Sequence, residues 1–113
     1  MMLTIAEKLK KIKTALVSVS GKVYHYTKPD NVKAGYIVWA ESSEDQSFSA
    51  DNRKQEQKII GYIDLYTQKE FDPIVDAVQD ALLSVDGCGF GLTTVQYEDE
   101  TKLIHYTWEF WVV

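Results

Sequence analysis

The chain has 113 residues, of which 45% are hydrophobic and 26% are charged, and its formal net charge is −5. This balance is typical of a folded globular protein and excludes a disordered chain. The length predicts one domain, residues 1–113, that buries roughly two-thirds of the surface its unfolded chain exposes. Cys88 is the only cysteine, which excludes an intrachain disulfide and a cysteine-rich zinc site. No stretch approaches the ~20 apolar residues that cross a bilayer, so we expect no membrane partner.

The charge is unevenly distributed along the chain. Residues 1–34 carry seven lysines and two acidic residues, a net of +5, whereas the remaining residues carry five basic and fifteen acidic side chains, a net of −10. Copies of such a chain can pack head to tail, because each presents the complementary sign to its neighbour. The simpler alternative is a lysine-rich helix face exposed to solvent.

A first helix is predicted to begin at Thr4. Thr4 and Glu7 have the spacing of a capping box, and apolar residues recur from Ile5 to Val17 at helical intervals. The helix is expected to end at or shortly before Gly21. Four lysines fall between the apolar positions and are expected on the surface: Lys8, Lys10, Lys11 and Lys13.

Three strands are predicted next. They span Val23–Thr27, Tyr36–Glu41 and Lys58–Tyr66, with turn residues at 28–31 after the first strand. The third strand has apolar residues on both faces, so both are expected to be covered, and Gly61 marks a possible bulge.

A second helix and a hairpin complete the pattern. Asp72 is expected to cap the helix, Pro73 to occupy its first turn and Gly87 to end it. Strands Leu92–Glu98 and Lys102–Val113 follow, joined by an acidic turn. The order α-β-β-β-α-β-β predicts an α+β fold with both helices on one face of a mostly antiparallel sheet, and a long mobile loop between the second and third strands.

The residues give little sign of catalysis or cofactor binding. Gly87–Gly91 is glycine-rich, but no helix start follows to bind a phosphate, and Cys88 has no recognisable base. His25 and His105 are possible neighbours on one sheet face, where Asp64 would complete a metal site, but their spacing is not that of a ligand set. Histidines partly exposed on strands are the simpler interpretation, so we expect no metal and no cofactor.

Nucleic-acid binding is also disfavoured by the residues. The chain is acidic overall, and Arg53 is its only arginine. The tryptophans Trp39, Trp108 and Trp111 are able to stack on bases, but strands bury such residues in cores and interfaces far more often.

The stretch from Ser42 to Gln55 is polar and unusually long for a connection between strands. Phe48 is its only bulky apolar residue, so little burial would offset the entropy lost on ordering it. Loops of this length in compact domains are uncommon and are often functional. The alternative is a neutral surface excursion.

Three stretches resemble small proteins encoded in the tail-assembly regions of phages and prophages of Gram-positive bacteria. They are VYHYTKPDNVKAGYIVWAE, SFSADNRKQEQKIIGYIDLYT and EFDPIVDAVQDAL, within residues 23–82. The element order is also similar to that of the tail terminator, or tail completion, proteins of long-tailed phages. The resemblance to phage tail clusters is more specific than the assignment to one tail component.

The resemblance to tail terminators implies a structural role without enzymatic activity. Such proteins form hexameric rings on the end of the tail tube and provide the surface that joins the head, and a long loop between strands becomes ordered on assembly. The implied partners are other copies, the tail tube protein and a head-tail connector. The implied locations are the cytoplasm of the host bacterium during assembly and then the virion tail.

The resemblance also suggests which residues make contacts. The assembly loop would contribute Glu44, Asp45, Phe48, Asp51, Asn52, Arg53 and Lys54. Contacts between subunits would pair the four lysines of the first helix with Asp72, Asp76 and Asp80 of the next copy. The alternative function is another neck or minor tail component, such as a head-tail connector subunit, and a more distant one is a small enzyme or ligand-binding domain.

Overall fold

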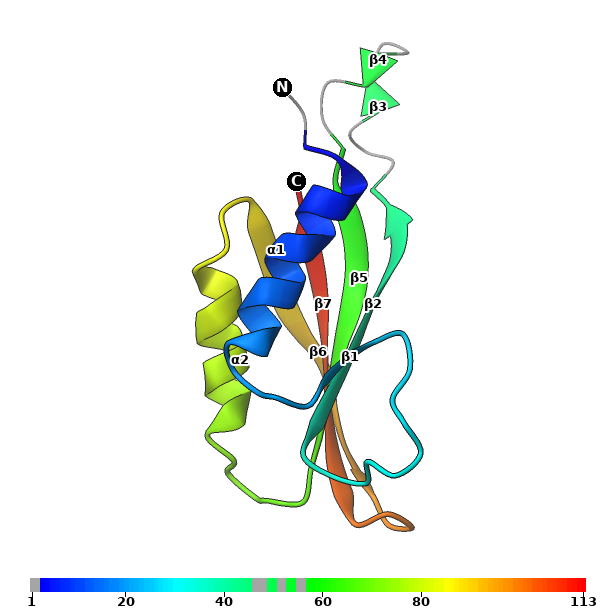
Figure 1. Ribbon diagram of the computed structural model, residues 1–113, viewed down its shortest axis with the longest axis vertical. Coiled ribbons are helices and arrows are strands. Elements are labelled where there is room, and N and C mark those ends of the chain that lie inside the picture. Colours follow the sequence, from blue (N-terminus) through cyan, green and yellow to red (C-terminus); the bar gives the residue numbers. More distant parts are fainter. Residues whose placement is uncertain (1–2, 46–48, 51–52, 55–56) are drawn as a thin grey trace.

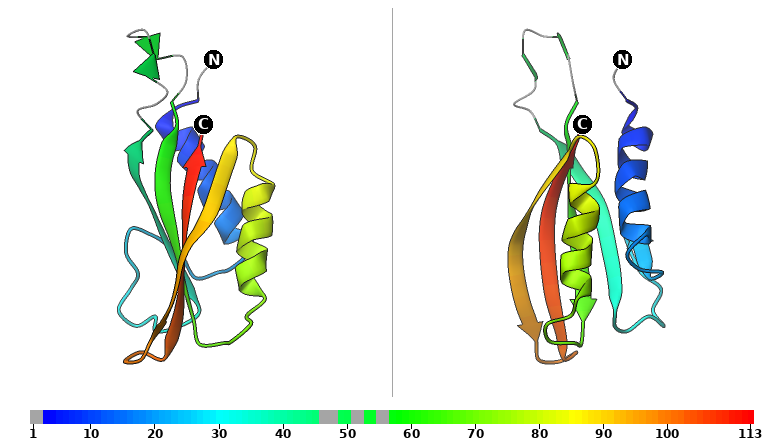
Figure 2. Two further views of the ribbon diagram at one scale, coloured as in Figure 1. Left: turned by 180° about the vertical axis from the view of Figure 1, so that it is seen from behind. Right: turned by 90° about the vertical axis from the view of Figure 1, so that its left-hand side faces the viewer.

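The computed structural model describes residues 3–45, 49–50, 53–54 and 57–113. Two helices lie on one face of a five-stranded sheet with the strand order β1-β2-β5-β7-β6 (Figures 1 and 2). The elements are α1 Ile5–Val17, β1 Val23–His25, β2 Tyr36–Glu44, β5 Ile59–Thr67, α2 Ile74–Leu83, β6 Cys88–Glu98 and β7 Leu103–Val112. β1 is parallel to β2 and the other three pairings are antiparallel. The predicted α+β class and element order are confirmed.

Helix α1 begins where its capping residues predict, and α2 begins one residue later than predicted. Thr4 and Glu7 form the capping box of α1, with reciprocal backbone-to-side-chain bonds of 2.8 and 3.1 Å. Before α2, an Asp72 carboxylate oxygen accepts a 3.0 Å bond from the Ile74 amide, although the helix itself begins one residue later than predicted. The first turn of each helix therefore has donors satisfied by side chains, as isolated helix ends require.

The sheet edge at β1 is shorter than predicted. β1 stops at His25 because Tyr26 adopts a φ of +74°, which an extended strand does not allow. The connection of residues 26–35 then runs back along the edge so that β2 starts parallel to β1 (Figure 1). The expectation of a strand to Thr27 is wrong for this reason.

β2 is longer than predicted and extends into the polar stretch. It continues to Glu44, which pairs with Ile59 of β5, and the Asp45 amide donates a 2.8 Å bond to the carbonyl of Lys58. A register shift between Glu41 and Ser43 marks a bulge opposite Gly61 and Ile60, so the bulge occurs where Gly61 suggested it, with the extra residue in β2. Two further short strands, β3 Ser49–Ala50 and β4 Arg53–Lys54, pair antiparallel beyond this end of the sheet (Figure 1). Of the residues predicted for the mobile loop, 46–48, 51–52 and 55 lie outside the described ones.

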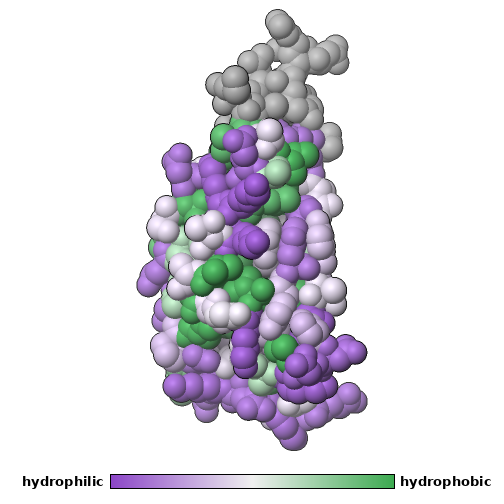
Figure 3. Space-filling view, viewed as in Figure 1, coloured by the Kyte–Doolittle hydropathy of each residue, from purple (hydrophilic) through white to green (hydrophobic). Residues whose placement is uncertain are grey.

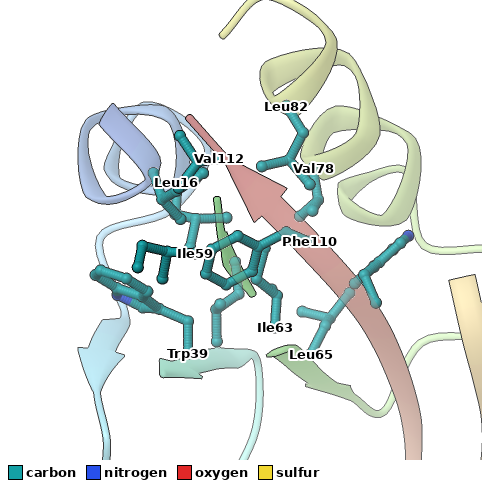
Figure 4. Packing of buried hydrophobic residues seen from close by; sticks show 12 residues of the cluster. Leu16, Trp39, Ile59, Ile63, Leu65, Val78, Leu82, Phe110 and Val112 are labelled. Atoms are coloured by element: carbon teal, nitrogen blue, oxygen red, sulfur yellow. The ribbon is translucent and has the colours of Figure 1, made fainter. Parts of the chain in front are cut away.

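One face of the sheet, here called the helix face, forms the core. Apolar residues of β2, β5 and β7 project from it against both helices, and Figure 4 shows this packing. The buried cluster consists of Ile12, Leu16, Ile37, Trp39, Ile59, Ile63, Leu65, Val78, Leu82, Trp108, Phe110 and Val112. The opposite face, here called the open face, carries half-buried and exposed side chains such as Asp64 and Tyr62. The expectation that both faces of β5 are covered is therefore wrong, because both helices pack on the same side.

Two glycines create space for aromatic rings. A Cβ atom at Gly61 would lie 2.4 Å from the carbonyl oxygen of Ala40 and 2.5 Å from the Phe110 ring. On the open face, a Cβ at Gly89 would lie 2.2 Å from the Trp111 indole. Gly89 is part of β6, which starts at Cys88 rather than at the predicted Leu92, so most of the glycine-rich segment is strand. Its glycines admit close packing within the sheet.

No helix in the described ranges is both long and apolar enough to span a membrane.

Replacing Gly61 with alanine is expected to destabilise the fold by about 3 kcal/mol, because the new methyl group meets a backbone oxygen as well as the buried Phe110 ring. The matched control is Gly91→Ala, since a Cβ at Gly91 has nothing within 4 Å. The control is expected to be neutral or slightly stabilising. Chemical denaturation of both variants measures the difference, and equal free energies of unfolding would contradict this account.

Candidate functional site

The lysines of α1 are not equivalent. Lys8 is 1% exposed, and its ammonium donates a 2.8 Å hydrogen bond to the backbone carbonyl of Gln57, two residues before β5. The prediction that Lys8 lies on the surface is therefore wrong. Its aliphatic stem packs inside while its charged end remains hydrogen-bonded, as buried lysines require.

The other three lysines of α1 differ in how far they are free to contact a partner. The Lys11 ammonium donates to the carbonyl oxygens of Asp86 and Val113, at 3.0 and 3.3 Å, and so ties α1 to the α2–β6 connection and to the residue that follows β7. Lys10 and Lys13 are exposed. The exposed basic surface of α1 thus reduces to Lys10 and Lys13, with Lys11 beside it.

The three aspartates predicted to contact the next copy, Asp72, Asp76 and Asp80, are not equivalent either. Asp72 is half-buried and accepts bonds from the Thr67 hydroxyl at 2.6 Å and from the Ile74 amide. Asp76 and Asp80 are exposed, four residues apart on one side of the helix. Asp72 therefore has a structural role in this chain, and the exposed acidic row consists of Asp76 and Asp80.

The residues predicted for the assembly loop lie in different parts of the structure. Glu44 is the last residue of β2 and accepts a 3.4 Å bond from the Gln57 side chain. Asp45 is within 3.5 Å of the Lys58 ammonium. Both belong to the end of the sheet rather than to a loop, because β2 extends further than its polar sequence suggests. Arg53 and Lys54 form β4, whereas Phe48, Asp51 and Asn52 lie outside the described residues.

The two histidines lie on opposite faces of the sheet, so they are not the neighbours that a shared metal site requires. His105 is on the open face, where its Nε2 atom is 2.8 Å from Asp64 and its ring stacks on Tyr66. His25 is on the helix face at the β1 edge. The described residues contain no group of three or more metal-ligating side chains.

His25 is part of a compact aromatic stack that sequence analysis missed. Its ring lies between Tyr26 and Trp39, with ring centroids 3.8 and 4.0 Å apart. Glu41 holds the stack from one side, because it contacts His25 Nε2 at 2.7 Å and accepts a bond from the Tyr26 hydroxyl. Only the register between β1 and β2 brings these residues together, and no local motif signals that register.

The hydrogen bonds of this stack change the acidities of its members. Burial by itself would raise the pKa of Glu41, but bonds from the Tyr26 hydroxyl, from its own backbone and from His25 together lower this pKa below its ordinary value. The bond to Glu41 raises the pKa of the Tyr26 phenol. The stack is therefore built around an ionised carboxylate.

A shallow pocket of about 570 Å³ opens beside this stack, between the C-terminal half of α1 and β1 with its following connection. Apolar and aromatic side chains form most of its wall, and two lysines stand at its rim. The lining residues used below are Lys13, Val17, Val23, Tyr24, Lys28 and Trp39. Figure 3 shows a hydrophobic patch in the middle of this face, at the level where α1 ends.

Phe71 is the second feature that sequence analysis did not single out. It is 87% exposed and has a φ of +57°, in the connection between β5 and α2. The local pattern predicted only a helix start at this point. A signal was available, since Phe71 follows the apolar alternation of β5 and precedes the stripe of α2, so it belongs to neither buried set.

Cys88 is half-buried against the core, as a small hydrophobic residue would be. Burial raises the pKa of its thiol to about 11, which leaves very little thiolate near neutral pH. The structure therefore gives this cysteine the character of a packing residue.

Lys8→Ala is expected to lower the free energy of unfolding by about 2 kcal/mol, because the packed stem and a charged hydrogen bond are both lost. Lys10→Ala is the matched control on the same helix and is expected to change stability by less than ~0.5 kcal/mol. Urea denaturation measures both values. Equal effects of the two variants would show that Lys8 is not held as described.

Glu41→Gln is expected to lower thermal stability near neutral pH and to have progressively less effect in acid. A carboxylate whose pKa is lowered by folding contributes stability above its ordinary value of 4.5, and that contribution disappears as pH falls through the folded-state pKa. Melting temperatures from pH 7 to pH 3 measure this. Glu100→Gln, at an exposed position in the β6–β7 turn, controls for loss of a surface charge. A difference that persists at pH 3 would contradict the assignment.

The fold has counterparts among solved structures. Eight chains match it. One comes from a structure described as the virion of a native gene transfer agent (GTA) particle, and it aligns with a TM-score of 0.54 and 14% sequence identity over 96% of this chain and 96% of that chain. No family model matches the sequence, and neither does any curated protein. At this level of identity the likeness concerns the fold, and it extends over nearly the whole of both chains.

Proposed function

We propose that this chain is a structural protein of a phage-type virion, and specifically a tail terminator that forms a ring on the end of the tail tube and provides the surface for head joining. The observation that carries the proposal is the fold match to a virion chain over 96% of both chains. The resemblance of residues 23–82 to tail-assembly proteins supports it independently. The proposed partners are other copies of the chain, the tail tube protein and a head-tail connector.

The arrangement of charge suits assembly into a ring. Contacts in a ring join two different surfaces of each subunit. Lys10 and Lys13 are exposed on α1, and Asp76 and Asp80 are exposed on α2. The proposed contact places these lysines opposite the aspartates of the next copy, and Lys8 and Asp72 take no part because they are bonded within their own chain. Exposed pairs of this kind contribute little energy each but favour the correct orientation.

The second proposed contact surface is the segment between β2 and β5. Its described part includes the β3–β4 pair, which lies beyond the end of the sheet, at the same end of the molecule as the start of α1 (Figure 1). A segment in this position is able to reach a neighbouring subunit or the tube without disturbing the core. Glu44 and Asp45 would mark its base at the end of the sheet.

A head-tail connector subunit is the second candidate, because a fold match to a virion chain supports it equally. The two functions differ in the structure that the protein binds. A terminator binds the free end of a tail tube, whereas a connector binds the portal side of the head.

Electron microscopy of tail tubes assembled without this protein tests the proposal. Adding the purified protein is expected to place one ring on one end of each tube, and end-on views give the number of subunits, for which we expect six. Lys10→Glu with Lys13→Glu is expected to lower tube-end occupancy, and adding Asp76→Lys with Asp80→Lys is expected to restore it, because the charges are then exchanged. Lys33→Glu with Lys102→Glu changes the same charge at other exposed positions and serves as control.

Other outcomes of this assay point elsewhere. Binding to heads with no binding to tubes would favour the connector. Binding to neither would overturn the virion proposal. Normal capping by a variant that lacks residues 47–54 would remove the β3–β4 segment from the contact surface and leave the rest of the proposal intact.

A further inference from the structure

Phe71 is the most exposed large hydrophobic residue of the described chain, at 87%. Single exposed apolar residues are common on protein surfaces. Phe71 differs because its φ of +57° is one that bulky residues adopt only where the surrounding structure imposes it, at a cost of about 1–3 kcal/mol. An aromatic side chain held in solvent by a strained backbone gives the isolated chain no evident advantage.

The residues on both sides of Phe71 fix this conformation. Thr67, which is 3% exposed, accepts a 3.1 Å bond from the Lys69 amide and donates a 2.6 Å bond to Asp72. Asp72 in turn accepts a bond from the Ile74 amide at the start of α2. The chain is therefore fixed before and after Phe71, and the phenyl ring projects between two anchored points. Glu70, the preceding residue, is exposed and adds a negative charge beside the ring.

The pocket beside α1 has the complementary properties. Val17, Val23 and Trp39 supply an apolar wall, and Lys13 and Lys28 supply positive charge at the rim. Neither lysine forms an ion pair in the described ranges of the chain; Lys28 lies over the Tyr36 ring, with its Nζ atom 5.2 Å from the centroid, and donates weakly to a carbonyl. None of the residues that line the pocket is acidic. It is suited to an aromatic side chain accompanied by a carboxylate.

The wall of the pocket is also rigid. His25 and Trp39 line the pocket, and both are held in the stack that Tyr26 and Glu41 complete, so these two side chains are positioned before any partner binds. A preformed pocket loses less conformational entropy on binding than a flexible one.

The projecting ring and the pocket are separate surfaces of the molecule. Phe71 is in the connection between β5, the central strand, and α2, whereas the pocket lies between α1 and β1, an edge strand of the sheet (Figure 1). Because Phe71 is 87% exposed, it does not occupy the pocket of its own chain. A contact between two such different surfaces is head to tail, which is the type that closes rings.

We infer that Phe71 of one copy inserts into the pocket between α1 and β1 of the next copy, with Glu70 facing Lys13 and Lys28. This contact deepens the proposed ring-forming function and rests on it. It supplies an apolar anchor where the exposed ion pairs supply only orientation, and buried aromatic anchors dominate the energy of most interfaces.

Two variants test the contact from its two sides. Phe71→Ala removes the ring, and Val17→Glu with Lys28→Glu places two carboxylates in the pocket while leaving Lys13 unchanged for its proposed contact with Asp76 and Asp80. Each variant alone is expected to self-associate at least ~10-fold more weakly than the wild type, measured by sedimentation and by ring occupancy on tail tubes. Leu83→Ala removes another apolar residue, 73% exposed on α2, and is expected to behave as the wild type. Melting temperatures verify that all variants are folded. If Phe71→Ala does not fold, Phe71→Ser is used in its place.

Mixing the two defective variants provides the sharper test. One variant keeps its pocket and the other keeps Phe71, so an equimolar mixture retains a single intact contact. The mixture is expected to form pairs of one copy of each and nothing larger, at concentrations where each variant alone, with its at least ~10-fold weaker self-association, does not form pairs.

Each remaining result counts against the inference. Phe71→Ala that associates and caps tubes as the wild type does would overturn the contact and leave the terminator proposal standing. A mixture that fails to form pairs would also overturn it. A wild type that neither self-associates nor occupies tubes or heads would overturn both proposals together.

Discussion

The burial of one face of the sheet beneath two helices is the constraint on which the rest of the structure depends. β5 lies at the centre of the strand order, and its residues Ile59, Ile63 and Leu65 contact the core cluster formed with α1 and α2. At roughly 25 cal/mol per Å² of apolar surface, this burial is the main favourable contribution to folding. It also requires Gly61, because the Phe110 ring needs the space that a side chain there would fill. With both helices on one face, the open face and the sheet edges remain accessible.

The sequence was sufficient to predict features that repeat locally. The capping box at Thr4 and the alternation along β7 each reflect an interaction between residues close in the chain or a single buried face, so both helices and the hairpin were predictable. Features that depend on distant partners were not. Lys8 is buried because its ammonium donates a hydrogen bond to the carbonyl of Gln57, 49 residues away. β2 extends to Glu44 because β5 continues opposite it. A polar strand end has no hydrophobic alternation by which to recognise it.

The histidines show how a misplaced register changes a functional hypothesis. Both were assigned correctly to strands, yet a metal site depended on their sharing one face. β1 is a short parallel edge strand, and its pairing places His25 beside Trp39 and Glu41 on the helix face. On the open face His105 is paired with Asp64. Each histidine contacts a carboxylate of its own, so the two contribute to local order at separate places. The assembly residues were harder still to predict, since contacts between copies leave no periodic pattern in one sequence.

Two non-glycine residues with positive φ, Tyr26 and Phe71, connect the fold to the proposed contacts. At Tyr26 the strain is offset within the chain, because its hydroxyl bonds to Glu41 and its ring stacks on His25. At Phe71 the ring has no such compensation, and only its neighbours are anchored. A residue with positive φ therefore lies both beside the pocket wall and at the projecting ring. The Tyr26 side chain has partners within its own chain, whereas the Phe71 side chain is exposed. A lone aromatic residue exposes too little apolar area to cause indiscriminate aggregation, so it becomes energetically important only where a matching pocket is presented to it.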